Sequence, residues 1–317
     1  MAQTKRSTGH AISPDIVEAT ERLDEQHIFT TKTLGFLIHP NIITSLSSHD
    51  GPGDDTPGLK VADIGTGTGI WLLDVAKTYP SLCGQLVGFD VTFSSFPSPG
   101  ELPSNITFNV QDMHHPFPES EIGTYDIVAV RFVSSATSRV EWESTAKNLV
   151  TLLKPGGWLQ WIDSCNFSLY CSVPGTSRKA CQEIWDGLEP YRLKGGDDLV
   201  IGLMMREGRA GVNREDIGKG LGLVEVHEDV FSSDRLQDGP PGLEIRKMGT
   251  KNVMECFVGC LESLFGAEDL AVNGWTRDKI KGLEKQAMEE IEKGVYHTLD
   301  QVCIIGRKAT GPGSRTA

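Results

Sequence analysis

The sequence lacks any run of apolar residues long enough to cross a membrane. No segment approaches the ~18 uninterrupted apolar residues that a spanning helix needs. The basic residues near the N-terminus are not followed by the apolar stretch of a secretory signal. The seven cysteines are scattered, without a C-x-x-C pair and without histidines at zinc-finger spacing. These absences predict a reduced, cytoplasmic protein that holds no structural metal.

Basic residues are also few. The chain has 30 Lys and Arg against 43 Asp and Glu, which gives a net charge of −13. A protein that binds nucleic acid needs basic stripes against the phosphate backbone, and anionic membrane surfaces attract basic segments. We therefore expect neither a nucleic acid nor a membrane as a partner.

The length of 317 residues allows one large α/β domain with insertions, or two smaller domains. A helix is expected to begin at Ser13, a good N-cap followed by Pro14, and to continue to about residue 38. A Gly-, Pro- and Asp-rich segment at 51–58 is the clearest boundary. After it, short apolar runs alternate with helical segments, which predicts βαβ units and a mainly parallel sheet. The expected strands are 59–64, 85–89, 106–110, 125–130 and 158–162, with helices at 71–78 and 140–153.

The second half is more helical. Helices are expected at 178–188, 199–208, 243–265 and 276–293. Two alternating runs, 223–231 and 296–307, would add antiparallel strands at the sheet edge. We expect residues 1–50 to form a tail and a lid helix, 57–165 the core, and 166–310 the remaining strands with an inserted helical cap.

Glycine is in excess, at 35 of 317 residues, about 11% against a typical ~7%. The informative cluster is Gly65, Gly67 and Gly69, between a buried strand and a helix. Glycines let the backbone turn tightly and approach a ligand, and the helix start offers free N–H groups. A dinucleotide fingerprint would need glycine at position 70, which is Ile70, and the lysine of a phosphate-binding loop is missing.

Asp63-x-Gly65-x-Gly67-x-Gly69 resembles the first motif of the class I S-adenosylmethionine (SAM)-dependent methyltransferases. Further segments stand in the order of that family: Gly88-Phe89-Asp90, residues 109–113, residues 125–131, and the Leu-Leu-Lys-Pro-Gly-Gly sequence at 152–157. The resemblance implies a Rossmann-like fold with helices on both faces of a mainly parallel sheet, and SAM as the cofactor.

The resemblance also implies roles for individual residues. Asp90 would accept the two ribose hydroxyls, and Asp112 with the backbone N–H of Met113 would bind adenine. Asp63 would reach the methionine ammonium through water, or instead cap the glycine turn. Arg131 would pair with a carboxylate near the methionine end, or instead form a structural ion pair. The loop residues expected at the cofactor are Gly65, Thr66, Gly67 and Gly69.

Residues 21–27, 65–73 and 159–161 resemble fungal methyltransferases of secondary-metabolite pathways, which act on small molecules at O, N or S. Two positions depart from that pattern. Ala129 stands where the subfamily usually has histidine, and Asp163 stands near where relatives often carry glutamate. Both lie at the substrate end of the sheet, so they concern the acceptor rather than the cofactor.

A methyl-transfer enzyme must chiefly hold acceptor and methyl group in line, ~3–3.5 Å apart. A general base is needed only for a protonated nucleophile. The candidates are His114, His115, Asp163 and His27. The two adjacent histidines could instead belong to an exposed, proline-bounded loop, and His27 could be a packing or lid residue. Asp163 would act as a base or as a substrate anchor.

The sequence therefore predicts methyl transfer to O, N or S of a small, largely apolar natural product. One alternative is a methyltransferase-fold protein that binds SAM but catalyses a non-methylating step such as a cyclisation or a pericyclic reaction. Another is a regulatory relative that works in a protein complex. Neither a monomer nor a homodimer is excluded.

Overall fold

A computed structural model describes residues 14–47, 58–98, 100, 102–133, 136–137, 141–194, 220–236, 240–264 and 274–310. Within them lies a seven-stranded sheet of order β3-β2-β1-β4-β5-β7-β6. The expected helix at 199–208 and most of the boundary segment at 51–58 fall outside the described residues. The division of the chain at that boundary stays a prediction.

Five parallel strands form the core of the sheet, and two antiparallel strands complete it. The parallel strands are β1 (Leu59–Ile64), β2 (Cys83–Asp90), β3 (Ile106–Val110), β4 (Tyr125–Arg131) and β5 (Leu153–Cys171). The antiparallel ones are β7 (Val295–Lys308) and the edge strand β6 (Leu223–Ser232). The strand order reverses between β1 and β4, which is where ligands bind in open α/β sheets.

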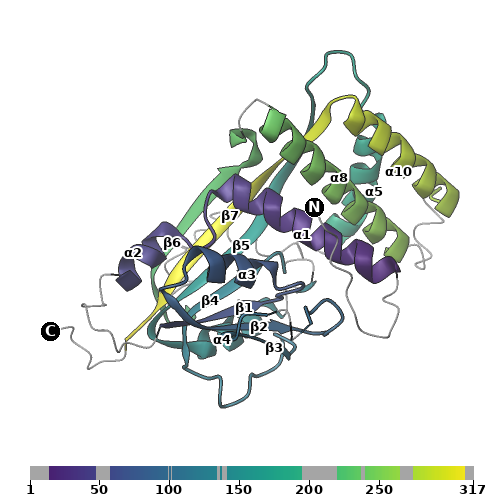
Figure 1. The fold of residues 1–317 in the computed structure, drawn as a ribbon. Coiled ribbons are helices and arrows are strands. Elements are labelled where there is room, and N and C mark those ends of the chain that lie inside the picture. Colours follow the sequence, from purple (N-terminus) through teal and green to yellow (C-terminus); the bar gives the residue numbers. More distant parts are fainter. Residues whose placement is uncertain are drawn as a thin grey trace.

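Helices cover both faces of this sheet (Figure 1). On one face lie α2 (Pro40–Ser47) and α3 (Ile70–Thr78). Their side chains Ile42 and Leu72 are buried in one cluster with Ile127 of β4. On the other face, α4 (Trp142–Leu152) packs against Val128 and Trp161. The structure confirms the expected Rossmann-like sheet with helices on both sides.

The N-terminal helix is shorter than expected. α1 spans Pro14–Leu34, and Gly35 follows it with φ 85°, donating its N–H to the carbonyl of Thr31 at 2.8 Å. Gly35 therefore ends the helix in the left-handed backbone conformation, which glycine adopts without strain. Pro40 then begins α2, because proline fits the first helical position.

The fifth strand is much longer than the expected 158–162. Beyond Ile162 it continues to Cys171, paired with β7 from Trp158↔Arg307 to Cys171↔Val295, with a register shift near Cys165. Residues 163–171 are mostly polar or small, so no apolar run marks them as a strand in the sequence. Their pairing with β7 provides the hydrogen bonds that the sequence pattern does not reveal.

This β5–β7 pair carries the helical cap (Figure 1). The cap consists of α5 (Lys179–Lys194), α8 (Pro240–Leu264) and α10 (Arg277–Glu292), whose buried side chains share one cluster with Leu169 and Val295. Thr276 caps α10, since its hydroxyl accepts the N–H of Lys279 at 3.1 Å. α1 lies between the cap and the glycine loop and contacts α8 and α3.

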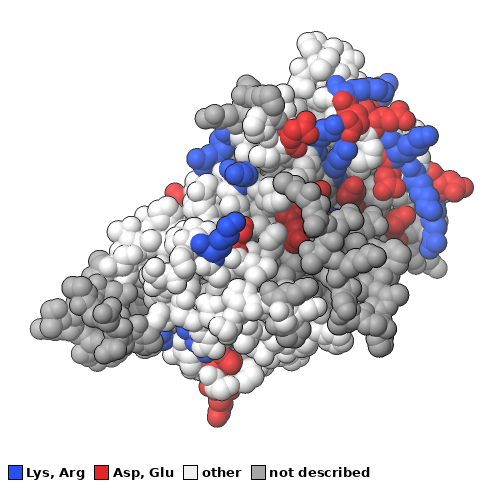
Figure 2. Space-filling model, viewed as in Figure 1, with Lys and Arg blue, Asp and Glu red and all other residues white. Residues whose placement is uncertain are grey.

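The outer surface of the cap carries charges of both signs. Figure 2 shows Lys and Arg interspersed with Asp and Glu over this part of the molecule. Lys251 pairs with Glu292 at 2.7 Å, and Lys279 pairs with Glu183 at 2.8 Å. Exposed pairs of this kind contribute little to stability, so this surface is a solvated face.

In the part of the chain that the structure describes, no helix combines the length and apolar composition needed to span a membrane.

Candidate cofactor site

The glycine loop joins β1 to α3 in backbone conformations that side chains disfavour. Gly67 has φ 56° and Gly69 has φ 73°. A Cβ on Gly69 would lie 2.3 Å from the ring of Phe108, and one on Gly67 would lie 3.2 Å from Leu23. The loop therefore needs glycine both for its left-handed φ angles and for its close packing against β3 and α1.

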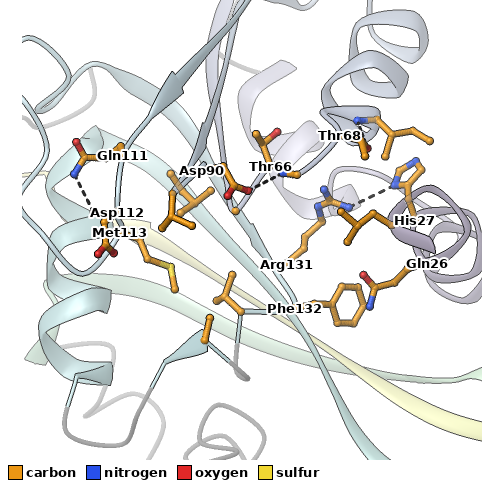
Figure 3. Close-up of a pocket in the computed structure, with 18 of the residues that line it drawn as sticks. Gln26, His27, Thr66, Thr68, Asp90, Gln111, Asp112, Met113, Arg131 and Phe132 are labelled. Carbon is orange, nitrogen blue, oxygen red and sulfur yellow. Dashed lines mark hydrogen bonds between the residues drawn. The ribbon is translucent and has the colours of Figure 1, made fainter. Parts of the chain in front are cut away.

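A cavity of about 350 Å³ opens beside this loop. Its walls come from the loop, from the carboxyl ends of β2, β3 and β4, and from α1, which carries Gln26 and His27 (Figure 3). The lining comprises Leu23, Gln26, His27, Ile64, Gly65, Thr66, Gly67, Thr68, Ile70, Asp90, Val91, Gln111, Asp112, Met113, His114, Arg131, Phe132, Val133 and Ala136.

Helix α1 forms the roof of the cavity through Leu23, Gln26 and His27. The hydroxyl of Thr68 donates to Asp24 Oδ1 at 2.6 Å, which ties the roof to the glycine loop. Residues three and four apart lie on one helix face, so the spacing of Leu23, Gln26 and His27 fits this arrangement. The N-terminal helix thus contacts the glycine loop directly.

Asp90 ends β2 at the cavity wall. Its Oδ2 accepts the N–H of Gly67 at 2.9 Å, and its Oδ1 accepts the N–H of Thr92 at 3.4 Å. A carboxylate has about four lone-pair sites, so two remain for a ligand. Asp90 thus lies at the carboxyl end of β2, next to the glycine loop.

Asp112 follows β3 with its side chain partly engaged. Oδ1 accepts the N–H of His114 at 2.9 Å, and Oδ2 lies 3.1 Å from His115 Nδ1. The N–H of His114 holds the pKa of this carboxyl below its usual value. Asp112 and the buried Met113 both line the cavity.

Asp63 and Arg131 form an ion pair at the opposite end. Arg131 Nη2 lies 3.3 Å from Asp63 Oδ2, which also accepts the hydroxyl of Thr66 at 2.8 Å. Arg131 lines the cavity, whereas Asp63 is fully buried behind it and caps the glycine turn. Asp63 Oδ1 and Arg131 Nε are buried without a hydrogen-bond partner among the described residues.

The candidate bases differ in access and in partners. His114 lines the cavity, but Nε2–H donates to the carbonyl of Ala136 at 2.9 Å and Nδ1 accepts from Thr145 Oγ1 at 2.8 Å. His115 does not line the cavity. Its side chain is 73% exposed and pairs with Asp112. Asp163 is buried, accepts the N–H of Ser164 at 2.9 Å, and does not line the cavity.

His27 is the remaining candidate, and both of its ring nitrogens have partners. Nε2 lies 3.0 Å from Asp74 Oδ2 on α3, and Nδ1 lies 3.4 Å from Arg131 Nη1. Burial and the neighbouring Arg131 cation lower the pKa of this imidazole, outweighing the opposing effect of Asp74 and Asp63.

Several residues that line the cavity carry no motif that marks them in the sequence. Gln111 and Phe132 are the main cases, and Phe132 has φ 53°, an uncommon backbone conformation for an aromatic residue. Its N–H donates to the carbonyl of Ile162 at 3.0 Å, which holds it at the end of β4. No local signal in the sequence marks such a backbone angle. Among the described residues, no group of three or more His, Cys, Asp or Glu side chains could hold a metal ion.

A family model described as a methyltransferase domain matches residues 61–157. Methyltransferase grgD of Penicillium sp is 35% identical over 173 residues, which cover 53% of this chain and 56% of that protein. N-methyltransferase sirN of Leptosphaeria maculans is 32% identical over 163 residues, which cover 51% of this chain and 55% of that protein.

Methyltransferase pytC of Aspergillus terreus is 31% identical over 257 residues, which cover 80% of this chain and 73% of that protein. The match to the first two relatives spans about half of their length, whereas the match to pytC extends over most of both chains. The glycine loop, most of β1 and the strands β2 to β4 lie within the family match. The chain therefore belongs to the SAM-dependent methyltransferases of the fungal secondary-metabolism type.

Proposed function

We propose that the protein transfers the methyl group of SAM to a small, largely apolar natural product. The observation that carries the proposal is the cavity under α1, which joins the glycine loop to Asp90, Asp112 and Arg131. Family membership supports SAM as the ligand of this cavity.

The residues present fit SAM. Asp90 has lone pairs left for ribose hydroxyls, and Asp112 with the Met113 N–H suits the adenine edge. At the other end, Arg131 Nε is a buried donor that lacks a partner among the described residues. Such a group is expected to have a ligand or water. It would bind the carboxylate of the methionine end.

The chain's own residues would position and shield the reactants. SAM, when bound there, supplies a methyl group activated on a sulfonium, which an acceptor lone pair can displace in one step. α1 would keep water from the cavity through Leu23 and Gln26. Phe132, Val133 and Ala136 would form an apolar wall toward the acceptor.

Among oxygen, nitrogen and sulfur as the acceptor atom, nitrogen has the most support. Among the described lining residues, His27 and His114 have both ring nitrogens engaged, so neither is free to take a proton from a hydroxyl. A neutral amine attacks without prior deprotonation and can lose its proton to solvent afterwards. The relative sirN is an N-methyltransferase, which points the same way.

The test is transfer of a labelled methyl group. Purified protein is incubated with methyl-labelled SAM and a small-molecule extract of the source organism from which the gene has been deleted. Label should enter one small molecule, on nitrogen, with wild-type protein and not with Asp90→Ala. Measurable SAM binding without labelling of any extract component would contradict methyl transfer. Label on oxygen or sulfur would contradict only the choice of nitrogen.

A further inference from the structure

His27 is buried between three elements at the end of the cavity that holds Arg131. It lies on α1 and is 3% exposed. Its Nε2 contacts Asp74 on α3 at 3.0 Å, and its Nδ1 contacts Arg131 on β4 at 3.4 Å. Figure 3 shows the imidazole of His27 facing the guanidinium of Arg131, and both side chains line the cavity.

The partners determine the form of the imidazole. A guanidinium can only donate hydrogen bonds, so Nδ1 must carry the lone pair. The proton then lies on Nε2, where it donates to the Asp74 carboxylate. His27 is therefore a neutral imidazole that accepts from Arg131, and its lowered pKa agrees with this form at neutral pH.

Arg131 is held on three sides by the chain. Nη2 faces Asp63 at 3.3 Å, Nη1 faces His27, and the guanidinium lies over the ring of Trp71 at 5.4 Å from its centroid. Nε is buried and has no partner among the described residues. A cation fixed this way needs no reorientation when a ligand anion arrives, which favours binding.

We propose that His27 is a positioning residue: it links Asp74 to Arg131 and thereby orients the guanidinium toward the carboxylate of SAM. This rests on the proposed function only in that SAM occupies the cavity. His27 would thus connect the roof helix to the amino-acid end of the cofactor, rather than act as the base of the reaction.

Asparagine and glutamine separate the two contacts of His27. The asparagine amide occupies the place of Nδ1, and the glutamine amide occupies that of Nε2. His27→Asn can keep the contact to Arg131, whereas His27→Gln can keep only the contact to Asp74. Ile28→Ala is the matched control, because Ile28 is the next residue of α1 and is 41% exposed.

Calorimetry with two ligands tests the proposal. S-adenosylhomocysteine has the carboxylate, and 5′-methylthioadenosine lacks the whole amino-acid end. His27→Ala and His27→Gln should weaken S-adenosylhomocysteine about tenfold or more, the loss of one hydrogen bond to a charged group. Both should leave 5′-methylthioadenosine within about twofold. His27→Asn and Ile28→Ala should bind both ligands like wild type.

Equal weakening of both ligands would overturn the proposal, because it would show that His27 only holds the roof in place. So would unchanged binding by His27→Ala, or retention by glutamine and not by asparagine. In each of these cases, binding of S-adenosylhomocysteine by the wild-type protein would still support the proposed function. Absence of S-adenosylhomocysteine binding by the wild type would instead remove the cofactor assignment and, with it, this role of His27.

Discussion

Asp90 combines two tasks that are usually separate. It fixes the glycine loop through the N–H of Gly67, and it presents its remaining lone pairs to the cavity. Its exchange therefore affects loop geometry and ligand contact together. Since hydrogen bonds to charged groups are worth ~1.5–3 kcal/mol each, loss of the two proposed ribose bonds would amount to several kcal/mol.

We predict that Asp90→Ala lowers the affinity for S-adenosylhomocysteine by about 100-fold or more, measured by calorimetry. Asp229→Ala is a suitable control, since Asp229 is half-exposed on the edge strand β6 and contacts His39, away from the cavity. An affinity within threefold of wild type for Asp90→Ala would show that the ribose lies elsewhere.

His297 is the clearest buried titratable group outside the cavity. It is 1% exposed on β7, its Nδ1 lies 2.9 Å from Thr250 Oγ1, and the rings of Phe29 and Phe167 pack against it. Burial lowers its pKa to about 3. The folded protein therefore keeps His297 neutral at a pH where the unfolded chain would bind a proton.

The sign of the pH effect follows from this difference. Below pH ~6.5, His297 binds a proton in the unfolded state, whereas in the folded state it stays neutral down to about pH 3. Stability falls as the pH drops through this window. At pH 4.5 the cost is about 2–3 kcal/mol. Denaturant unfolding should therefore show a smaller loss between pH 7 and 4.5 for His297→Gln than for wild type. An equal loss of stability in wild type and His297→Gln over this pH range would contradict the lowered pKa of His297.

The candidate bases show why single residues are hard to assign from sequence. His114 and His115 are adjacent, yet one is hydrogen-bonded to Thr145 and Ala136 while the other is exposed. Those partners come from segments that meet only in the folded chain. The place of Asp90 at the end of a strand could be predicted, because an acid after an apolar run is a local pattern, whereas its contact with ribose stays a prediction.

At the scale of elements, the glycine loop was readable and the extension of β5 was not. Buried parallel strands appear as apolar runs, so β1 and β4 fall close to their expected limits. The part of β5 beyond Ile162 is stabilised by antiparallel pairing with β7, which is distant in sequence. Pairing between distant segments leaves no local trace.

The glycine loop and the cap offer a matched pair of substitutions. Gly69 has a positive φ and contacts Phe108, whereas Gly282 lies in α10 with open space at its Cβ position. Gly69→Ala should destabilise the protein by about 2 kcal/mol or more. Gly282→Ala should stabilise it by roughly 0.5–1 kcal/mol.

Denaturant unfolding of both variants measures these differences. The expected result is a shift of the two midpoints in opposite directions. Equal shifts, or no loss for Gly69→Ala, would show that the loop is not held in the left-handed conformation described here.

The roof helix gives a further prediction at this scale. α1 contacts the loop through Asp24 and the cavity through His27, so a bound ligand should hold it in place. Hydrogen exchange of amides in 19–34 should slow when S-adenosylhomocysteine is added, as should exchange in the glycine loop. Exchange in α10, remote from the cavity, is the internal control. Unchanged exchange in α1 would show that the helix is not part of the binding site.

At the scale of the whole molecule, the sheet supplies the cofactor end and the β5–β7 pair carries the cap (Figure 1). The family match covers the sheet from β1 to the start of β5, whereas the cap helices α5, α8 and α10 lie beyond it. The family and its cofactor could be predicted from the sequence because the motifs at 63–69, 88–90 and 152–157 are local. The acceptor could not, because no motif in the chain identifies it.

The most direct test of this account is a crystal structure of the protein with S-adenosylhomocysteine. We expect the ligand in the cavity under α1, with its ribose hydroxyls hydrogen-bonded to Asp90 and its carboxylate against Arg131. A ligand bound outside this cavity, or bound there with its ribose away from Asp90, would contradict the account.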